Sequence, residues 1–363
     1  MEKKGLSLRA KSWIAVCLFA VVFAGLATLA SFYDLQISKL LTKHSLDSGE
    51  YISHSGFALF FEAIGSAPLY LMVAVVGLIW FWAAWRKGGK WRIAACFSLI
   101  LTVGGITMVF KDAFSYVAEY LGAQLGDDAL FVLASKKAAG SMYILGLSFV
   151  FGAVGTFLSA LAWKHIKPEI NDKMVWWAFA ILCAVAFYLV VHFVKGPVGR
   201  VRFRSMNYVG NFDAYTPWYV ANGKRDWMKE VYNVAIATDN AKSFPSGHTF
   251  SAAMVYSLLA IPYLDDKLNK KGVKIAVWCS CIAYVAVVAI SRIVAGAHYF
   301  SDVLFGGTIG FVGAIIGREI FVCKGSHFKA MFGIKGKSAQ DKEQPQKESE
   351  QPLSESEPSE QAE

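Results

Sequence analysis

The chain has 363 residues, of which 55% are hydrophobic and only 17% are charged. An ordinary soluble domain carries about 25% charged residues, so this composition excludes one and favours an integral membrane protein. The 36 lysines and arginines outnumber the 27 acidic residues. The basic residues are divided among separate short loops, however, which excludes a nucleic-acid-binding face.

Apolar runs recur along the chain at lengths that suit a bilayer, for which about 20 helical residues suffice. We predict eight helical spans, at Trp13–Phe32, Phe57–Trp85, Ile93–Phe110, Met142–Trp163, Val175–Val194, Phe250–Leu264, Ile275–Ile290 and Ser301–Val322. The second run contains Glu62 and Pro68, so its first part is expected to be a broken or interfacial helix, with Glu62 as a cap or a cavity-lining residue. The predicted fold class is therefore all-α, a polytopic transmembrane helical bundle.

The loops between these spans alternate in charge. Basic residues flank the N-terminus and follow the second, fourth, sixth and eighth spans, which by the positive-inside rule places both termini in the cytoplasm. The segment 195–249 breaks the pattern, because it carries eight basic residues on the translocated side. We interpret this excess of positive charge as a binding site for an anion.

The chain divides into three parts on this basis. Residues 1–174 hold about four N-terminal transmembrane spans, and residues 175–325 hold the remaining spans together with the polar clusters described next. Residues 338–363 are rich in Glu, Gln and Ser and lack aromatic side chains, so they are predicted to form a disordered acidic cytoplasmic tail.

Polar residues gather at three places where apolar spans end on the translocated side. The first cluster, Lys195–Arg204, follows the fifth span, and the second, Pro245–His248, precedes the sixth. The third, Ser291–Asp302, joins the seventh span to the eighth. A helical bundle could bring these ends together. For Arg200 and Arg204, snorkelling of the side chain to lipid headgroups is an equally good interpretation.

Each cluster has residues suited to phosphate chemistry. Ser246 is a good N-cap, and a helix N-terminus attracts anions through its free N–H groups. His248 at that position could exchange protons with a bound oxyanion. His298 and Asp302 are four residues apart, so on a helix the carboxylate could accept a hydrogen bond from one imidazole nitrogen and leave the other as a nucleophile. Asp302 could equally be a helix cap.

The combined pattern resembles the signature of the type 2 phosphatidic acid phosphatase superfamily. The matching residues are Lys195, Arg202, Pro245, Ser246, Gly247, His248, Ser291, Arg292, His298 and Asp302. Phe203 departs from the pattern, because the family usually has proline there. The resemblance covers about Val175–Val322 and implies a family-like six-helix catalytic core.

The resemblance also implies a role for each residue. His298 would attack phosphorus and form a phosphohistidine, Asp302 would orient and stabilise its imidazolium, and His248 would protonate the leaving oxygen and then activate water. The residues expected to hold the phosphoryl oxygens are Lys195, Arg202, Ser246, Gly247 and Arg292. Positioning and positive charge suffice for phosphoryl transfer, so no metal and no other cofactor is predicted.

The predicted function is hydrolysis of lipid phosphates or isoprenyl diphosphates at the outer face of the plasma or inner membrane. Undecaprenyl diphosphate, phosphatidic acid and phosphatidylglycerol phosphate all fit the pattern. The expected partners are the lipid substrate and membrane lipids, with no nucleic acid. Two alternatives stay open: a lipid phosphotransferase using the same phosphohistidine, and a non-catalytic lipid-binding or transport protein.

Overall fold

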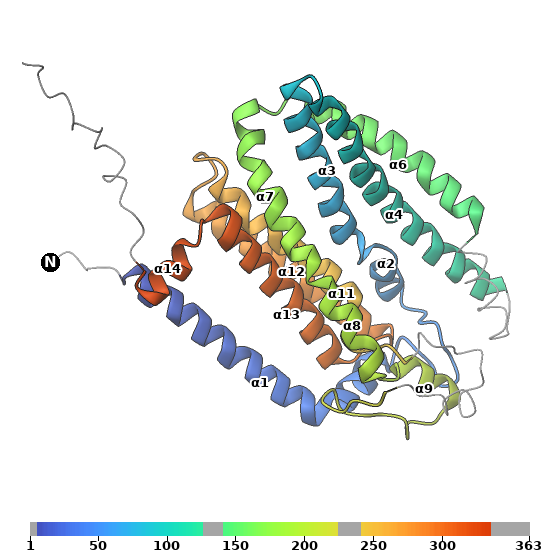
Figure 1. Ribbon diagram of the computed structural model, residues 1–363. Helices are drawn as coiled ribbons and strands as arrows, with labels where there is room; N and C mark the ends of the chain where they lie inside the picture. Colours follow the sequence, from blue (N-terminus) through green and yellow to red (C-terminus); the bar gives the residue numbers. More distant parts are fainter. Residues whose placement is uncertain (1–5, 126–140, 224–240, 335–363) are drawn as a thin grey trace, which may run out of the picture.

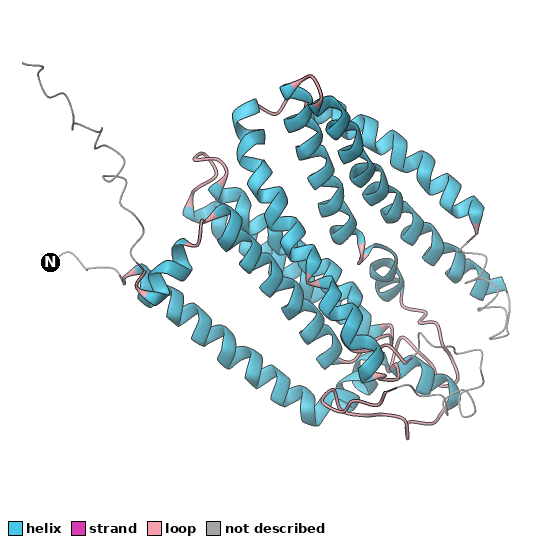
Figure 2. Ribbon diagram, viewed as in Figure 1, coloured by secondary structure: helices cyan, strands magenta, loops and turns pink. Residues whose placement is uncertain are grey.

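The computed structural model describes residues 6–125, 141–223 and 241–334. Every regular element in these residues is helical (Figures 1 and 2). Seven helical segments of the described chain are long and apolar enough to cross a membrane: Leu8–Thr42, Gly56–Lys87, Trp91–Leu121, Met142–Trp163, Pro168–Val209, Lys271–Val294 and Phe300–Val322. The prediction of an all-α, multi-pass membrane protein is confirmed. The expected tail, 338–363, lies outside the described residues.

The sixth expected span, Phe250–Leu264, is built differently from the others. Helix α11 (Gly247–Ala253) has seven residues and continues directly into a ten-residue 3₁₀ helix, η2 (Met254–Tyr263). The two together have fewer residues than an ordinary α-helical span, which is why this predicted span is not among the seven long helices. A 3₁₀ helix rises about 2.0 Å per residue, more than an α-helix.

Two of the long segments are interrupted. Helix α2 (Gly56–Ile64) is separated from α3 (Ala67–Lys87) by a short turn just before Pro68, so the expected break in the second run is present. Helix α7 (Pro168–Ala186) is followed after one residue by α8 (Tyr188–Val198) and then by the short α9 (Phe203–Val209).

The remaining helices complete the bundle. They are α1 (Leu8–Thr42), α4 (Trp91–Leu125), α6 (Met142–Trp163), α12 (Lys271–Val294), α13 (Phe300–Gly317), the π-helical turn η3 (Arg318–Val322) and α14 (Ser326–Phe332). The long helices run roughly side by side, and the C-terminal end of α1 lies at the same end of the bundle as α9 (Figure 1).

A buried apolar core joins α3, α7, α11 and α13. It includes Val76, Ile181, Phe250 and Ala314, all at most 2% exposed. Helix α13 approaches its neighbours closely through glycines: a Cβ atom at Gly306 would lie 2.3 Å from the Ser246 carbonyl oxygen. Small residues permit such backbone contact between membrane helices. The start of α13 is therefore fixed against the turn that precedes α11.

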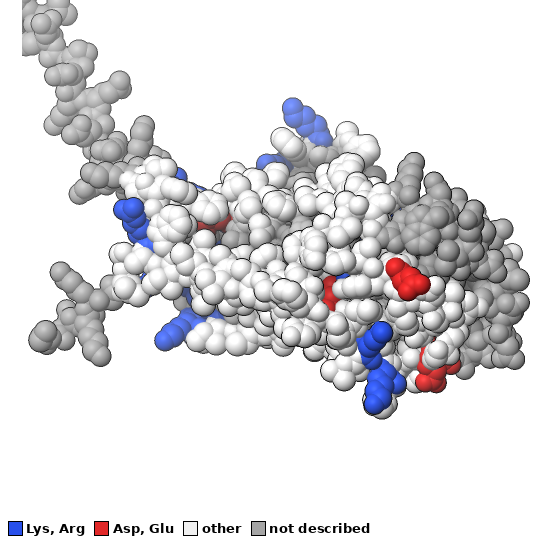
Figure 3. Space-filling view, turned by 90° about the horizontal axis from the view of Figure 1, so that it is seen from below, with Lys and Arg blue, Asp and Glu red and all other residues white. Residues whose placement is uncertain are grey.

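The outer surface is apolar over its middle. Large hydrophobic side chains on α1, α4 and α6 are exposed, among them Val21, Phe97 and Phe157. The described part of the face seen in Figure 3 is largely uncharged, with a small number of scattered Lys, Arg, Asp and Glu side chains. This distribution is that expected of a surface in contact with lipid tails.

Candidate active site

The three polar clusters of the sequence meet at one end of the bundle. The Ser246 N–H donates to the Asp302 carbonyl oxygen (2.9 Å), which joins the second cluster to the third. The Ser243 N–H donates to the Arg200 carbonyl oxygen (3.0 Å), and the Arg204 N–H donates to that of Gly296 (2.8 Å). Backbone hydrogen bonds between all three clusters thus fix their relative positions.

His298 lies in the turn between α12 and α13 and is only 1% exposed. Its Nδ1 is 2.8 Å from the Ser243 carbonyl oxygen and 3.6 Å from Asp302 Oδ2. Because the carbonyl can only accept, Nδ1 carries the proton. The lone pair then resides on Nε2, the nitrogen available to attack phosphorus.

Asp302 is in the first turn of α13 and is fully buried. Its Oδ2 accepts hydrogen bonds from the Tyr299 N–H (2.9 Å) and from the Ser243 hydroxyl. Its Oδ1 accepts one from Arg200 (2.7 Å). The spacing of four would place His298 and Asp302 on one helix face, whereas His298 precedes the helix and Asp302 caps it, the alternative role considered for Asp302. The two side chains are nevertheless neighbours, because the turn folds back onto the helix start.

Burial, with the nearby positive charges of Arg202 and Lys195, lowers the pKa of His298 to about 3, and the Asp302 carboxylate only partly offsets this shift. In the unfolded chain the pKa of histidine is about 6.5. Between these values the unfolded chain binds a proton that the folded chain does not, so acid reduces the free energy of unfolding.

The expected loss from this one group is about 1.4 kcal/mol per pH unit below 6.5, or about 2 kcal/mol at pH 5. Denaturation midpoints of detergent-purified wild type and His298→Gln at pH 7 and pH 5 measure it. His298→Gln has no titrating group at this position, so its free energy of unfolding should fall less between pH 7 and pH 5 than that of wild type. Equal pH dependence in both proteins would contradict the assignment.

His248 is the second residue of α11, two positions after the N-cap Ser246. The Ser246 hydroxyl oxygen accepts a hydrogen bond from the Thr249 N–H (3.3 Å), as expected of a cap. The His248 Nε2 is 3.3 Å from the hydroxyl oxygen of Tyr116, a residue of α4. Sequence analysis did not identify Tyr116, because nothing in its neighbourhood distinguishes it from other aromatic residues of the spans.

The three expected phosphate-binding cations surround the histidines. Lys195 Nζ donates to the Lys242 carbonyl oxygen (3.2 Å), and Arg202 Nη1 donates to that of Ala297 (3.3 Å). Both cations act electrostatically on His298.

The third cation, Arg292, is 1% exposed and lies close enough to His248 to act on its charge. Its Nη2 donates to Glu62 Oε1 (2.7 Å), while its Nε and Nη1 are buried without a hydrogen-bond partner among the described residues. Buried donors of this kind require an explanation, and a bound phosphoryl group would satisfy them.

Snorkelling is the wrong interpretation for the two remaining arginines. Arg200 is 1% exposed, and its guanidinium is paired with Asp34 (2.9 Å) and Asp302 (2.7 Å). Arg204 is also buried and is 3.3 Å from Glu62. Buried guanidinium groups need carboxylate partners, and here the first two spans provide them. The sequence analysis missed Asp34 and gave Glu62 only as a cap or a cavity-lining residue.

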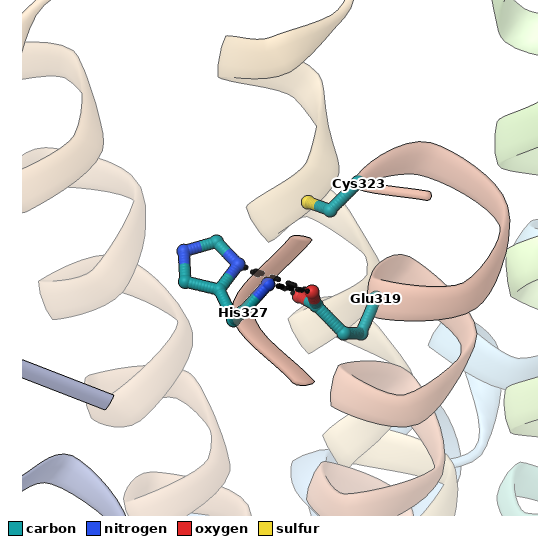
Figure 4. Close-up of side chains that lie close together, drawn as sticks. All are labelled: Glu319, Cys323 and His327. Carbon is teal, nitrogen blue, oxygen red and sulfur yellow. Dashed lines mark hydrogen bonds and ion pairs between the residues drawn. The ribbon is translucent and has the colours of Figure 1, made fainter. Parts of the chain in front are cut away.

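A second group of chemically active side chains lies at the far end of α13. Glu319, Cys323 and His327 could each offer one ligand atom to a metal, all within 4.8 Å of one another (Figure 4). The Glu319 carboxylate accepts a hydrogen bond from the His327 N–H (2.7 Å) and lies 2.9 Å from its ring Nδ1. Glu319 and His327 are therefore hydrogen-bonding partners of each other, and they lie away from the site around His298.

Comparison with known proteins gives three relatives of partial length. Phosphatidylglycerophosphatase B of Bacillus subtilis (strain 168) is 31% identical over 96 residues, which are 24% of this chain and 44% of that protein. Lipoprotein signal peptidases of two Coxiella burnetii strains, RSA 493 / Nine Mile phase I and RSA 331 / Henzerling II, are 27% and 26% identical over 119 residues. Those matches cover 31% of this chain and 69% of each peptidase. No solved structure matches the chain.

A family model also matches, that of the PAP2 superfamily, the type 2 phosphatidic acid phosphatases expected from the sequence. It covers residues 207–323, which contain His248, His298 and Asp302 and begin after Lys195 and Arg202. The predicted resemblance to the PAP2 superfamily is therefore confirmed for residues 207–323.

Proposed function

We propose that this chain is a membrane lipid phosphatase that hydrolyses lipid phosphates or isoprenyl diphosphates through a phosphohistidine on His298. The observation that carries the proposal is the meeting of His298, His248 and Arg292 at one buried site, with donors of Arg292 left without protein partners. The PAP2 match over this segment supports it.

The chemistry proceeds in two steps. His298 Nε2 attacks phosphorus, a P–N bond forms and the P–O bond to the lipid breaks, while His248 gives its proton to the leaving oxygen. In the second step His248 takes a proton from water, whose oxygen displaces the histidine and releases inorganic phosphate. The cations Lys195, Arg202 and Arg292 offset the charge on the phosphoryl oxygens in both steps.

A cavity beside the site supports a lipid substrate. It has a volume of about 300 Å³ and lies between α2 and the C-terminal part of α4. Its walls include the apolar Leu59 and Phe60, and Glu62, Tyr116 and Arg204 also line it. Since Glu62 binds Arg292 and Tyr116 contacts His248, the cavity adjoins the proposed catalytic residues. A lipid tail would reach the site through this cavity from between two spans.

The similarity to lipoprotein signal peptidases does not lead to a second candidate. A peptidase mechanism that uses paired aspartates, one candidate chemistry for a peptidase, needs the two carboxylates close enough to share a proton. At this site the two buried aspartates, Asp34 and Asp302, are each paired with Arg200, whose guanidinium lies between them. With the guanidinium between them, the two carboxylates are not placed to share a proton.

The positive-inside pattern of the loops supports a cytoplasmic location for both termini. The site then faces the extracytoplasmic side of the plasma or inner membrane. Substrates with their phosphate headgroup in the outer leaflet would reach it directly.

Phosphate release by detergent-purified protein tests the proposal. The substrates are phosphatidic acid, phosphatidylglycerol phosphate and undecaprenyl diphosphate, each with EDTA and each with and without a lipid acceptor. We expect EDTA-resistant phosphate release from at least one lipid without an acceptor. Release that requires the acceptor would identify a phosphotransferase instead. Lipid binding with no turnover under either condition would identify a non-catalytic protein.

A further inference from the structure

We propose that Asp34, in the first helix, is a positioning residue of the active site that acts on His298 through Arg200 and Asp302. This inference rests on the proposed function. Asp34 and Arg200 both lie outside the segment 207–323 that matches the PAP2 superfamily.

The buried residues of helix α1 form a narrow stripe in its C-terminal half. They are Ala30, Asp34, Ser38 and Thr42, spaced four apart. Most of the helix is exposed, as expected of a lipid-facing span. A buried aspartate in such a helix is costly and by default indicates function.

Arg200 connects Asp34 to the site. Its Nη2 donates to Asp34 Oδ2 (2.9 Å) and its Nη1 to Asp302 Oδ1 (2.7 Å). Its Nε donates to the Thr216 carbonyl oxygen (2.9 Å), and its guanidinium lies over the Tyr299 ring at 4.0 Å. All three nitrogens are therefore engaged, so Arg200 is held in place and cannot serve as a phosphate ligand.

Asp34 also holds the start of α13 directly. Its Oδ1 accepts the Ser301 N–H (2.8 Å), and its Oδ2 accepts the Ser301 hydroxyl. Ser301 is in the first turn of α13, where an acidic group is favoured by the free N–H groups and the helix dipole. The neighbouring residue, Asp302, is thus fixed from two sides, through Arg200 and through its own helix.

The charges explain what Asp34 contributes. Asp302 alone with Arg200 would form a neutral pair, which stabilises a positive His298 weakly. With Asp34 included, the three side chains carry one net negative charge when both carboxylates are ionised. The ring of His298 becomes positive when the phosphohistidine forms, so this net charge lowers the barrier to that step.

Asp34→Asn is the informative variant, because it removes the charge with little change in shape. Its one amide oxygen can replace Oδ2 as the acceptor for Arg200 and the Ser301 hydroxyl, whereas the hydrogen bond from the Ser301 N–H to Oδ1 is lost. We expect kcat to fall about 10- to 100-fold with KM changed less than about threefold, a smaller loss than removal of a directly hydrogen-bonded aspartate gives in a catalytic triad. Asp34→Glu restores the charge and should recover most of kcat.

Glu319→Gln is the matched control. It removes another buried membrane carboxylate, one paired with His327 at the far end of α13, and should leave kcat unchanged. Rates are normalised to folded protein by gel filtration. A wild-type kcat in Asp34→Asn, or an equal loss in Glu319→Gln, would overturn the inference.

Two further comparisons separate possible failures. If Asp34→Asn does not fold, Asp34→Glu provides the test. A folded Asp34→Glu whose kcat is reduced more than about tenfold would show that the negative charge at this position does not determine kcat. His298→Gln runs in the same series. Activity that survives in His298→Gln refutes the proposed function, whereas its loss together with a normal Asp34→Asn refutes only the role of Asp34.

Discussion

Replacing His298 with glutamine is expected to lower phosphate release by at least about 10⁴-fold, because removal of a catalytic nucleophile has effects of this size in other hydrolases. Glutamine can retain a hydrogen bond to the Ser243 carbonyl oxygen through its amide, so the turn between α12 and α13 should keep its fold. What is lost is the lone pair on Nε2.

Trapping of the phosphoenzyme gives the sharper measurement. Wild type labelled with ³²P-phosphate lipid and quenched in alkali should carry label that survives base and is lost in acid, as a phosphohistidine is. His248→Gln should form and lose the label more slowly than wild type, since it lacks both the acid of the first step and the base of the second. His298→Gln should carry none. Label on His298→Gln would assign the nucleophile to another residue.

The second large effect is expected at Arg292. Arg292→Gln should lower kcat/KM about 10³-fold, comparable to the loss of other arginines that stabilise phosphoryl transfer. One edge of the guanidinium is occupied by Glu62, and the remaining two nitrogens have no partner in the described part of the chain. The N–H groups of those nitrogens can donate charge-assisted hydrogen bonds to phosphoryl oxygens.

Arg292→Lys separates charge from geometry. Lysine keeps the positive charge but lacks the planar guanidinium, so kcat/KM of Arg292→Lys should be only about tenfold higher than that of Arg292→Gln. Steady-state kcat and KM with a phosphate lipid, and the inhibition constant of orthovanadate, measure both variants. If Arg292→Gln keeps kcat/KM within about threefold of wild type, Arg292 serves only to pair with Glu62.

Much of this architecture could be predicted from the sequence, because its signals are local. The apolar runs identify the spans, and Pro68 marks the break between α2 and α3. The three clusters are recognisable because each places reactive residue types at a span end, and His298 and Asp302 are four residues apart.

The partners of these residues could not be predicted in the same way. Asp34 contacts Ser301, 267 positions away in the chain, and Glu62 contacts Arg292 across 230 positions. Tyr116 and His248 are separated by 132. A single sequence carries no signal for such pairs, because each depends on how the helices pack. The 3₁₀ helix in the sixth span was not predicted for a different reason: composition does not distinguish a 3₁₀ helix from an α-helix.

The distance along the chain between Asp34 and His298 has a consequence for biosynthesis. Asp34 leaves the ribosome with the first span, and His298 and Asp302 leave with the last hairpin, formed by α12 and α13. A nascent chain that has inserted every earlier span still lacks the nucleophile, and its Arg200 has only one of its two carboxylate partners. If His298 is the nucleophile as proposed, partly inserted chains are chemically inert toward the surrounding lipids, and the capacity for hydrolysis arises when the final hairpin docks.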